Sequence, residues 1–110
     1  MAKHDLDDIF QALADPTRRD VIARLSSAQV LSIGILAERY DMALPSFMKH
    51  IAVLETCGLI ETAKQGRVRH CRIATDRLSK AADWINDQRV IWEDRTDRLA
   101  AFAETEKDTT

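Results

Sequence analysis

The sequence predicts a mainly helical fold with one small β-hairpin, in the order α-α-α-α-β-β-α. Up to Gly58, apolar residues recur with the spacing of amphipathic helices. Over residues 59–73 the pattern changes to an alternation with a period of two, which is typical of strands. Residues 76–104 contain no glycine or proline, which favours one long helix. A chain of 110 residues has the usual size of one domain, so we expect residues 1–110 to share a single core.

The first two helices are predicted over residues 5–14 and 16–27. Apolar side chains in the first segment fall at positions i, i+3, i+4 and i+7, which places them on one stripe. These are Leu6, Ile9, Phe10 and Leu13. Asp15 is a favourable N-cap for the second helix, and Pro16 occupies its first position, where the missing N–H costs nothing. We expect a loop around residues 30–31 after this helix.

The next two helices form a predicted helix-turn-helix. Ser32 can cap a third helix that ends at Asp41. Its apolar residues recur at helical spacing: Ile33, Leu36, Ala37 and Tyr40. Pro45 then opens a fourth helix that runs to Thr56, and Gly58 follows as a left-handed C-cap. Two helices joined by a short connection, the second closed by glycine, are the outline of a helix-turn-helix.

The predicted hairpin concentrates positive charge. Its strands are expected over residues 59–64 and 67–73, around a turn at Gln65-Gly66. Four basic side chains fall at its tip and on its second strand: Lys64, Arg67, Arg69 and Arg72. The net charge of the whole chain is −2, but its middle third is basic and lies between two acidic segments. Charge alone therefore neither indicates nor excludes a nucleic-acid partner, and the sequence motifs are needed to distinguish the two cases.

The long C-terminal helix has a wider apolar surface than one packing seam requires. Leu78, Ile85, Trp92 and Leu99 repeat every seven residues, with further apolar side chains beside them. We therefore predict a two-fold homodimer in which the first and last helices pack against their counterparts. The predicted interface residues are Leu6, Ile9, Phe10, Leu13, Ile85, Trp92 and Leu99.

The order of these elements is that of a winged helix. In that fold the second helix of the helix-turn-helix enters the major groove of DNA, and the hairpin reaches toward the flanking backbone. Three stretches also carry a family resemblance: LADPTRRDVIARL, ILAERYDMALPSFMKHIAVLETCGLI and QGRVRHCRI. In order and spacing they resemble the ArsR/SmtB family of bacterial repressors, over about residues 5–75. The resemblance implies a DNA-binding regulator, and the long last helix is similar to the dimerisation element of that family.

The predicted recognition helix, residues 45–56, can also be analysed from its own geometry. When Phe47, Ile51 and Leu54 face the core, a rotation of about 100° per residue turns Lys49 to the opposite side. There a lysine can approach a phosphate or a guanine. By the same argument the DNA-binding residues are expected on this helix and on the hairpin. They are Pro45, Ser46, Met48, Lys49, His50, Arg67 and Arg69.

Two positions on this helix have a more specific interpretation. His50 flanks the core side, and two roles remain open for it: a phosphate contact, as the resemblance implies, or a hydrogen bond to a backbone carbonyl. Ala43 stands where relatives often have a serine cap. The N-terminus of the recognition helix is therefore expected to keep an amide free for phosphate or water.

The sequence thus predicts a cytoplasmic, sequence-specific transcriptional regulator that acts on double-stranded DNA. We expect a dimeric repressor that reads an imperfect palindrome, with an unknown small-molecule or metal effector left open. No apolar run is long enough for a membrane span, and the chain has neither a secretory signal at its start nor a catalytic motif, so we expect no membrane partner and no enzymatic activity.

Two alternatives to a simple repressor remain. The resemblance implies metal sensing in some members, through cysteines in the third helix or Asp and His ligands in the last. This chain has neither set, so no metal or cofactor is expected. The first alternative is a metal- or thiol-responsive repressor that uses Cys57 and Cys71. The second is a winged-helix adaptor that contacts proteins and not DNA.

Overall fold

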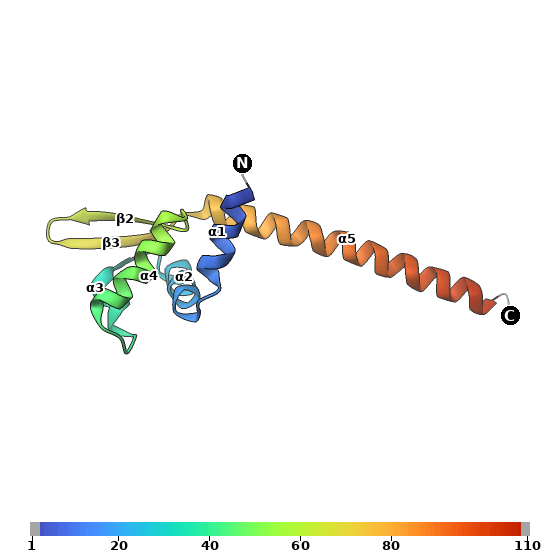
Figure 1. The fold of residues 1–110 in the computed structure, drawn as a ribbon, viewed down its shortest axis with the longest axis horizontal. Helices are drawn as coiled ribbons and strands as arrows, with labels where there is room; N and C mark the ends of the chain where they lie inside the picture. The colour runs from blue at the N-terminus through green and yellow to red at the C-terminus, as the bar shows by residue number, and fades with distance from the viewer. Residues whose placement is uncertain (1–2, 109–110) are drawn as a thin grey trace.

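The computed structural model describes the backbone of residues 3–108 and the side chains of residues 5–105 (Figure 1). The elements follow the chain in the order α1, α2, β1, α3, α4, β2, β3, α5. Their bounds are α1 Lys3–Leu13, α2 Pro16–Ala28, β1 Val30–Ser32, α3 Ile33–Glu38, α4 Leu44–Thr56, β2 Ile60–Gln65, β3 Val68–Ile73 and α5 Thr75–Asp108. The predicted fold, a mainly helical winged helix, is confirmed.

One core holds the helices and the sheet together. It is entirely apolar among the described residues, and α1, α2, α3, α4 and the sheet all contribute to it. Its fully buried large side chains are Ile9, Val21, Leu25, Leu36, Phe47, Leu54, Leu59, Ile60 and Cys71. The stripes predicted for the third and fourth helices therefore face the interior, at Ile33 and Leu36 and at Phe47, Ile51 and Leu54.

The segment predicted as a loop around residues 30–31 is instead strand β1. It pairs antiparallel with β3, so the sheet has three strands in the order β1-β3-β2. Leu31 faces Cys71 across the first pair, and Thr62 faces Cys71 across the second. The hairpin turn lies at Gly66-Arg67, one residue later than predicted, and Gly66 has a positive φ of 66°, which glycine adopts without strain.

Helix α3 is shorter than the sequence predicts. It begins at the Ser32 cap, whose hydroxyl accepts a hydrogen bond from the backbone N–H of Ile35 at 3.2 Å, as expected. It ends at Glu38 and not at Asp41, so Tyr40 lies in the turn before α4. The side chain of Tyr40 is held by α2, and this tertiary contact outweighs its helical spacing.

Helix α5 extends well beyond the rest of the molecule (Figure 1). It spans 34 residues and continues to Asp108, past the predicted end at Glu104. Its first turns pack against α1, where the rings of Phe10 and Trp84 meet edge to face with their centroids 5.8 Å apart. Beyond that contact the side chains of α5 are exposed up to Thr105, and the molecule measures 75 × 31 × 22 Å. No helix in the described part of the chain is long and apolar enough to cross a membrane.

Candidate nucleic-acid interface

Helix α4 presents a polar face to the outside, as predicted. Phe47, Ile51 and Leu54 are buried, while Lys49 on the opposite side is exposed. Pro45 and Ser46 are also exposed in the first turn. These side chains leave one surface of α4 open for contact with another molecule.

The N-terminus of α4 has no side-chain cap. Ala43 occupies the N-cap position and makes no capping hydrogen bond, as expected from its methyl side chain. Pro45 has no amide hydrogen, so it adds no unpaired donor to the first turn. An anion at this end of α4 would meet the positive end of the helix dipole.

Two of the predicted contact residues are partly withdrawn from this surface. Met48 is half-buried and packs against the core, so only part of its side chain is accessible. His50 is 21% exposed, and its Nδ1 lies 3.1 Å from Nη1 of Arg18 and 3.7 Å from Oδ2 of Asp15. The sequence predicts either a phosphate or a backbone carbonyl as the partner of His50. In the structure its partners are two side chains, Arg18 of α2 and Asp15, the N-cap residue of α2. Because these partners engage Nδ1, a phosphate contact by His50 would have to use Nε2, the other ring nitrogen.

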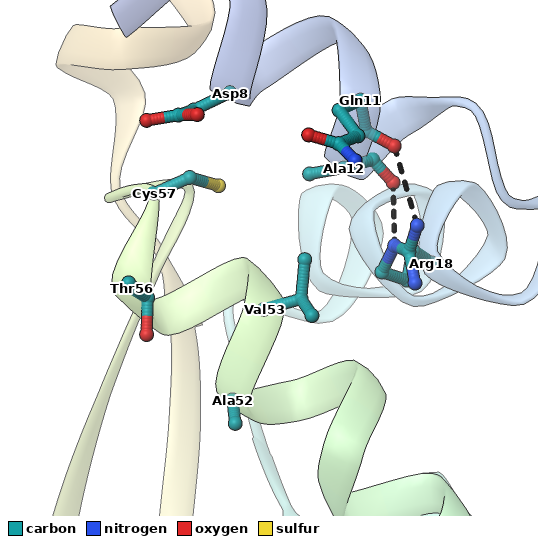
Figure 2. Close-up of a pocket in the computed structure, with 8 residues that line it drawn as sticks. All are labelled: Asp8, Gln11, Ala12, Arg18, Ala52, Val53, Thr56 and Cys57. Atoms are coloured by element: carbon teal, nitrogen blue, oxygen red, sulfur yellow. Dashed lines mark hydrogen bonds between the residues drawn. The ribbon is translucent and has the colours of Figure 1, made fainter. Parts of the chain in front are cut away.

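Arg18 joins α1 to α4, a role that the sequence did not reveal. Its Nε donates to the carbonyl oxygen of Ala12 at 2.7 Å, and its Nη2 donates to that of Gln11 at 3.2 Å (Figure 2). These carbonyls belong to the last turn of α1, where few backbone donors remain; that of Gln11 also accepts from the backbone N–H of Ala14 at 3.2 Å. The remaining guanidinium nitrogen, Nη1, lies within hydrogen-bond distance of Nδ1 of His50 on α4. A hollow of about 540 Å³ lies beside this bridge, between α1, α2 and α4.

Asp15 supports the same corner of the molecule. Its carboxylate accepts a hydrogen bond from the backbone N–H of Arg18 at 3.0 Å, which confirms the predicted N-cap of α2. That backbone hydrogen bond lowers the pKa of Asp15, and the nearby His50 and the Arg18 guanidinium lower it further against the effect of burial. Asp15 therefore stays ionised beside His50 at neutral pH.

The strand register places two cations of the hairpin on the side that faces α4. Lys64 and Arg69 are direct cross-strand partners, and residues of one strand that are two apart share a face. Thr62 and Cys71 lie on this same face; the Thr62 hydroxyl donates to the carboxylate of Glu55 on α4. Both Lys64 and Arg69 are exposed, so the hairpin adds positive charge beside the open face of α4.

The four basic side chains of the hairpin differ in how free they are. Arg69 donates to the hydroxyl of Thr62 at 2.9 Å, and Arg72 pairs with Glu61 at 2.7 Å. Arg67 in the turn and Lys64 make no hydrogen bond or ion pair within the described part of the chain. Lys64 and Arg67 can therefore reach a phosphate without breaking another interaction, and Arg69 would give up one hydrogen bond to a neutral hydroxyl, whereas Arg72 would lose an ion pair. Lys64 is absent from the DNA-binding residues that the sequence predicts, because only the strand register reveals which face it occupies.

The predicted dimer residues fall into three groups by their exposure. Ile9 is fully buried in the protomer core, so its assignment to a dimer interface is wrong: its side chain packs within the chain. Leu6, Phe10 and Leu13 are half-buried on α1. The α5 residues of the predicted interface, Ile85, Trp92 and Leu99, are 52%, 69% and 68% exposed.

The two cysteines are both unpaired and both protected. Cys57 is the C-cap of α4, and its thiol donates to the carbonyl oxygen of Leu54 at 3.4 Å, whereas Cys71 is buried in the middle of β3. Burial raises the pKa of both thiols, to about 11 for Cys71. The thiolate is the form that binds metals and reacts with oxidants, so these surroundings do not favour the thiol-responsive alternative. The described residues hold no cluster of three His, Cys, Asp or Glu side chains able to bind a metal ion.

A helix-turn-helix with one open polar face, flanked by a basic hairpin, defines a winged helix of the DNA-binding class. Residues 13–63 match the family model described as a helix-turn-helix domain. The arsenical resistance operon repressor of Escherichia coli is 32% identical over 72% of this chain and 68% of its own length. The transcriptional repressor SdpR of Bacillus subtilis is 25% identical over 73% of this chain and 88% of its own length.

Solved structures agree with this class. The crystal structure of an ArsR family transcriptional regulator is 49% identical, has a TM-score of 0.78, and matches 84% of this chain and 95% of its own. An ArsR-like transcriptional regulator from Rhodococcus sp. RHA1 is 30% identical, with a TM-score of 0.71 over 87% of this chain and 90% of its own. This chain belongs to the ArsR family of DNA-binding transcriptional regulators, as the resemblance implied.

Proposed function

We propose that this regulator is a homodimeric repressor that reads an imperfect palindrome through two copies of α4. The observation that carries the proposal is the placement of Lys64 and Arg69 on the face of the hairpin that adjoins the open face of α4. Cations on both elements can then contact one DNA duplex at the same time. Repression is supported by the two relatives whose names describe repressors.

Within each protomer, α4 supplies the base contacts and the hairpin supplies backbone contacts. Lys49 is exposed and unpaired in the described part of the chain, so it can approach a guanine or a phosphate without breaking another interaction. Ser46 can donate to a phosphate or a base edge, and Pro45 offers an apolar contact. Lys64 and Arg67 contact the phosphates that flank the groove.

The dimer is supported by the exposed apolar surface of α5. Beyond its contact with α1, this helix carries Ile85, Ile91, Trp92, Leu99 and Phe102 with about half or more of each side chain exposed. A contiguous apolar surface of this kind on one helix marks an interaction site. A second copy of the chain is the occupant that fits, because a two-fold axis brings the same stripe onto itself. The half-buried α1 residues Leu6, Phe10 and Leu13 extend this surface.

A two-fold dimer would present its two α4 helices to one side of a duplex. Half-sites of the palindrome would then be about 34 Å apart, which is one helical turn of DNA. Binding at that spacing over a promoter excludes other proteins, so the regulator acts by occupancy and not by catalysis. Chromosomal DNA as the partner places this action in the cytoplasm.

The decisive experiment is selection of binding sites from a random duplex library by the purified protein. We expect an enriched, imperfectly palindromic sequence with half-site centres about 10 base pairs apart. Its affinity should fall steeply between about 50 and 200 mM salt, because neutralised phosphates release counterions. Failure to enrich any sequence, together with no retention on heparin at low salt, would favour the protein-contact adaptor.

A further inference from the structure

We infer that Tyr40 is a positioning residue for DNA reading, because its hydroxyl and its ring together fix the turn between α3 and α4. This inference rests on the proposed function of α4. Tyr40 is half-buried in the five-residue connection between the two helices of the motif. Within the described residues its hydrogen bonds and ring contacts go to Asp20, Arg24 and the buried Phe47, and not to the open face of α4 or to the hairpin, so we expect any effect on DNA binding to pass through the orientation of α4.

The hydroxyl of Tyr40 is held from α2. It donates to Oδ2 of Asp20 at 2.6 Å, a short hydrogen bond to a charged acceptor, and it accepts from Nη1 of Arg24 at 3.3 Å. Burial, followed by the hydrogen bond to Asp20, raises the pKa of Tyr40. The phenol therefore keeps its proton and remains the donor of this bond.

The ring of Tyr40 provides the second half of the connection. It stacks on the ring of Phe47, with centroids 5.4 Å apart and planes inclined by 19°. Phe47 is 1% exposed and lies in the first turns of α4, so it cannot move without moving the helix. The guanidinium of Arg24 also lies over the Tyr40 ring, 5.5 Å from its centroid.

Arg24 ties the end of α3 into the same group. Its Nη1 donates to the carbonyl oxygen of Leu36 at 2.8 Å, and its Nη2 donates to that of Ile35 at 3.3 Å. These carbonyls belong to the last turn of a six-residue helix, which has no internal donors for them. Asp20 and Arg24 on α2 therefore hold the end of α3, the turn and the start of α4 as one unit.

We expect this arrangement to affect sequence-specific binding to DNA bases more than non-specific binding to phosphates. Contacts to base edges require side chains held to within about half an ångström, whereas phosphate attraction tolerates larger displacements. Loosening the turn should therefore reduce specific binding and leave non-specific binding unchanged. A residue with a purely structural role would lower both through loss of folded protein.

The test uses Tyr40→Phe, which keeps the ring stacked on Phe47 and removes the hydroxyl. With the site enriched by the wild-type protein, we expect about tenfold weaker binding, or about 1.4 kcal/mol. Binding to a random duplex and its salt dependence should match the wild type, as should the helical circular dichroism. Ser26→Ala is the matched control, because it removes a hydroxyl of α2 that bonds only within its own helix, to Ile22.

A second pair of variants keeps the inference falsifiable. Asp20→Ala breaks the same hydrogen bond and also removes a long ion pair with the exposed Arg39, 3.7 Å, which contributes little. It should therefore weaken specific binding about as much as Tyr40→Phe, and the double variant should be no weaker than Asp20→Ala alone. Unchanged specific binding in Tyr40→Phe would overturn the inference, as would losses that add in the double variant or fall equally on random DNA. A wild-type protein that binds no duplex would overturn the proposed function as well, so the two failures are distinguishable.

Discussion

Substitution of Trp92 by alanine should separate the proposed dimer into monomers. Trp92 is 69% exposed on α5, the largest exposed fraction among the large apolar side chains of the described residues. A fully exposed tryptophan presents about 250 Å² of surface, so about 170 Å² of Trp92 is available for a partner to cover. Alanine at this position also favours the helix, so α5 itself should remain intact.

The size of the effect follows from this area. At about 25 cal/mol per Å², covering Trp92 stabilises a dimer by about 4 kcal/mol per protomer. An alanine side chain at this position would retain roughly a quarter of that stabilisation, because its apolar area is smaller. Two protomers give an upper value of about 6 kcal/mol, and ordering the side chain on association offsets part of it. We therefore expect a loss of about 2–4 kcal/mol, which raises the dimer dissociation constant roughly 30- to 1,000-fold.

Sedimentation equilibrium over a range of protein concentrations measures this constant directly. Asp94→Ala is the control, because two residues along a helix correspond to a rotation of about 200°, which turns Asp94 to the other side of α5. Its ion pair with Arg98 is exposed and contributes little. An unchanged dimer constant in Trp92→Ala, or an equal loss in Asp94→Ala, would refute the assignment of this stripe to the dimer interface.

Three further predictions concern DNA contacts and the buried thiol. Lys49→Ala should weaken binding to the selected site and reduce the slope of log K against log salt by about 0.9 per protomer, measured by mobility shift; unchanged affinity would remove Lys49 from the contacts. Joint replacement of Arg67 and Arg69 by alanine should weaken all duplexes about equally, and a loss confined to one base position would contradict a backbone role. Because the pKa of Cys71 is raised to about 11, its burial as a neutral thiol favours the folded state below about pH 9 and loses that contribution as the pH rises toward 11. Urea denaturation should therefore show the stability difference between wild type and Cys71→Ala shrinking over that interval, and a constant difference would count against the shift.

The sequence predicts most of the fold because long periodic segments determine it. The helical stripes, the Asp15 cap and the glycine of the hairpin act locally, so each can be recognised without knowledge of the rest of the chain. Strand β1 was missed because three residues are too few to show a period, and it exists only through its pairing with β3. The end of α3 was misplaced because a hydrogen bond between Tyr40 and Asp20 competes with helical spacing.

The candidate site was predicted less completely, because its details depend on contacts between distant residues. The helical spacing of apolar residues predicts that Lys49 points outward. It could not reveal that the side chain of His50 contacts Arg18, 32 residues earlier in the chain. An apolar stripe in the sequence also does not indicate whether its side chains pack within the same chain or against a second chain. For that reason the pattern alone assigns Ile9 to the interface, whereas its side chain is fully buried in the core of the protomer.

The bridge formed by Arg18 makes the first helix and the recognition helix mechanically dependent on each other. A tilt of α1 pulls on the guanidinium, and the guanidinium is held at the same time by His50 on α4. In the proposed dimer, the angle at which two protomers meet would thus set the distance between their recognition helices. Promoter sites with slightly different spacing would then be distinguished at the subunit boundary, far from any base.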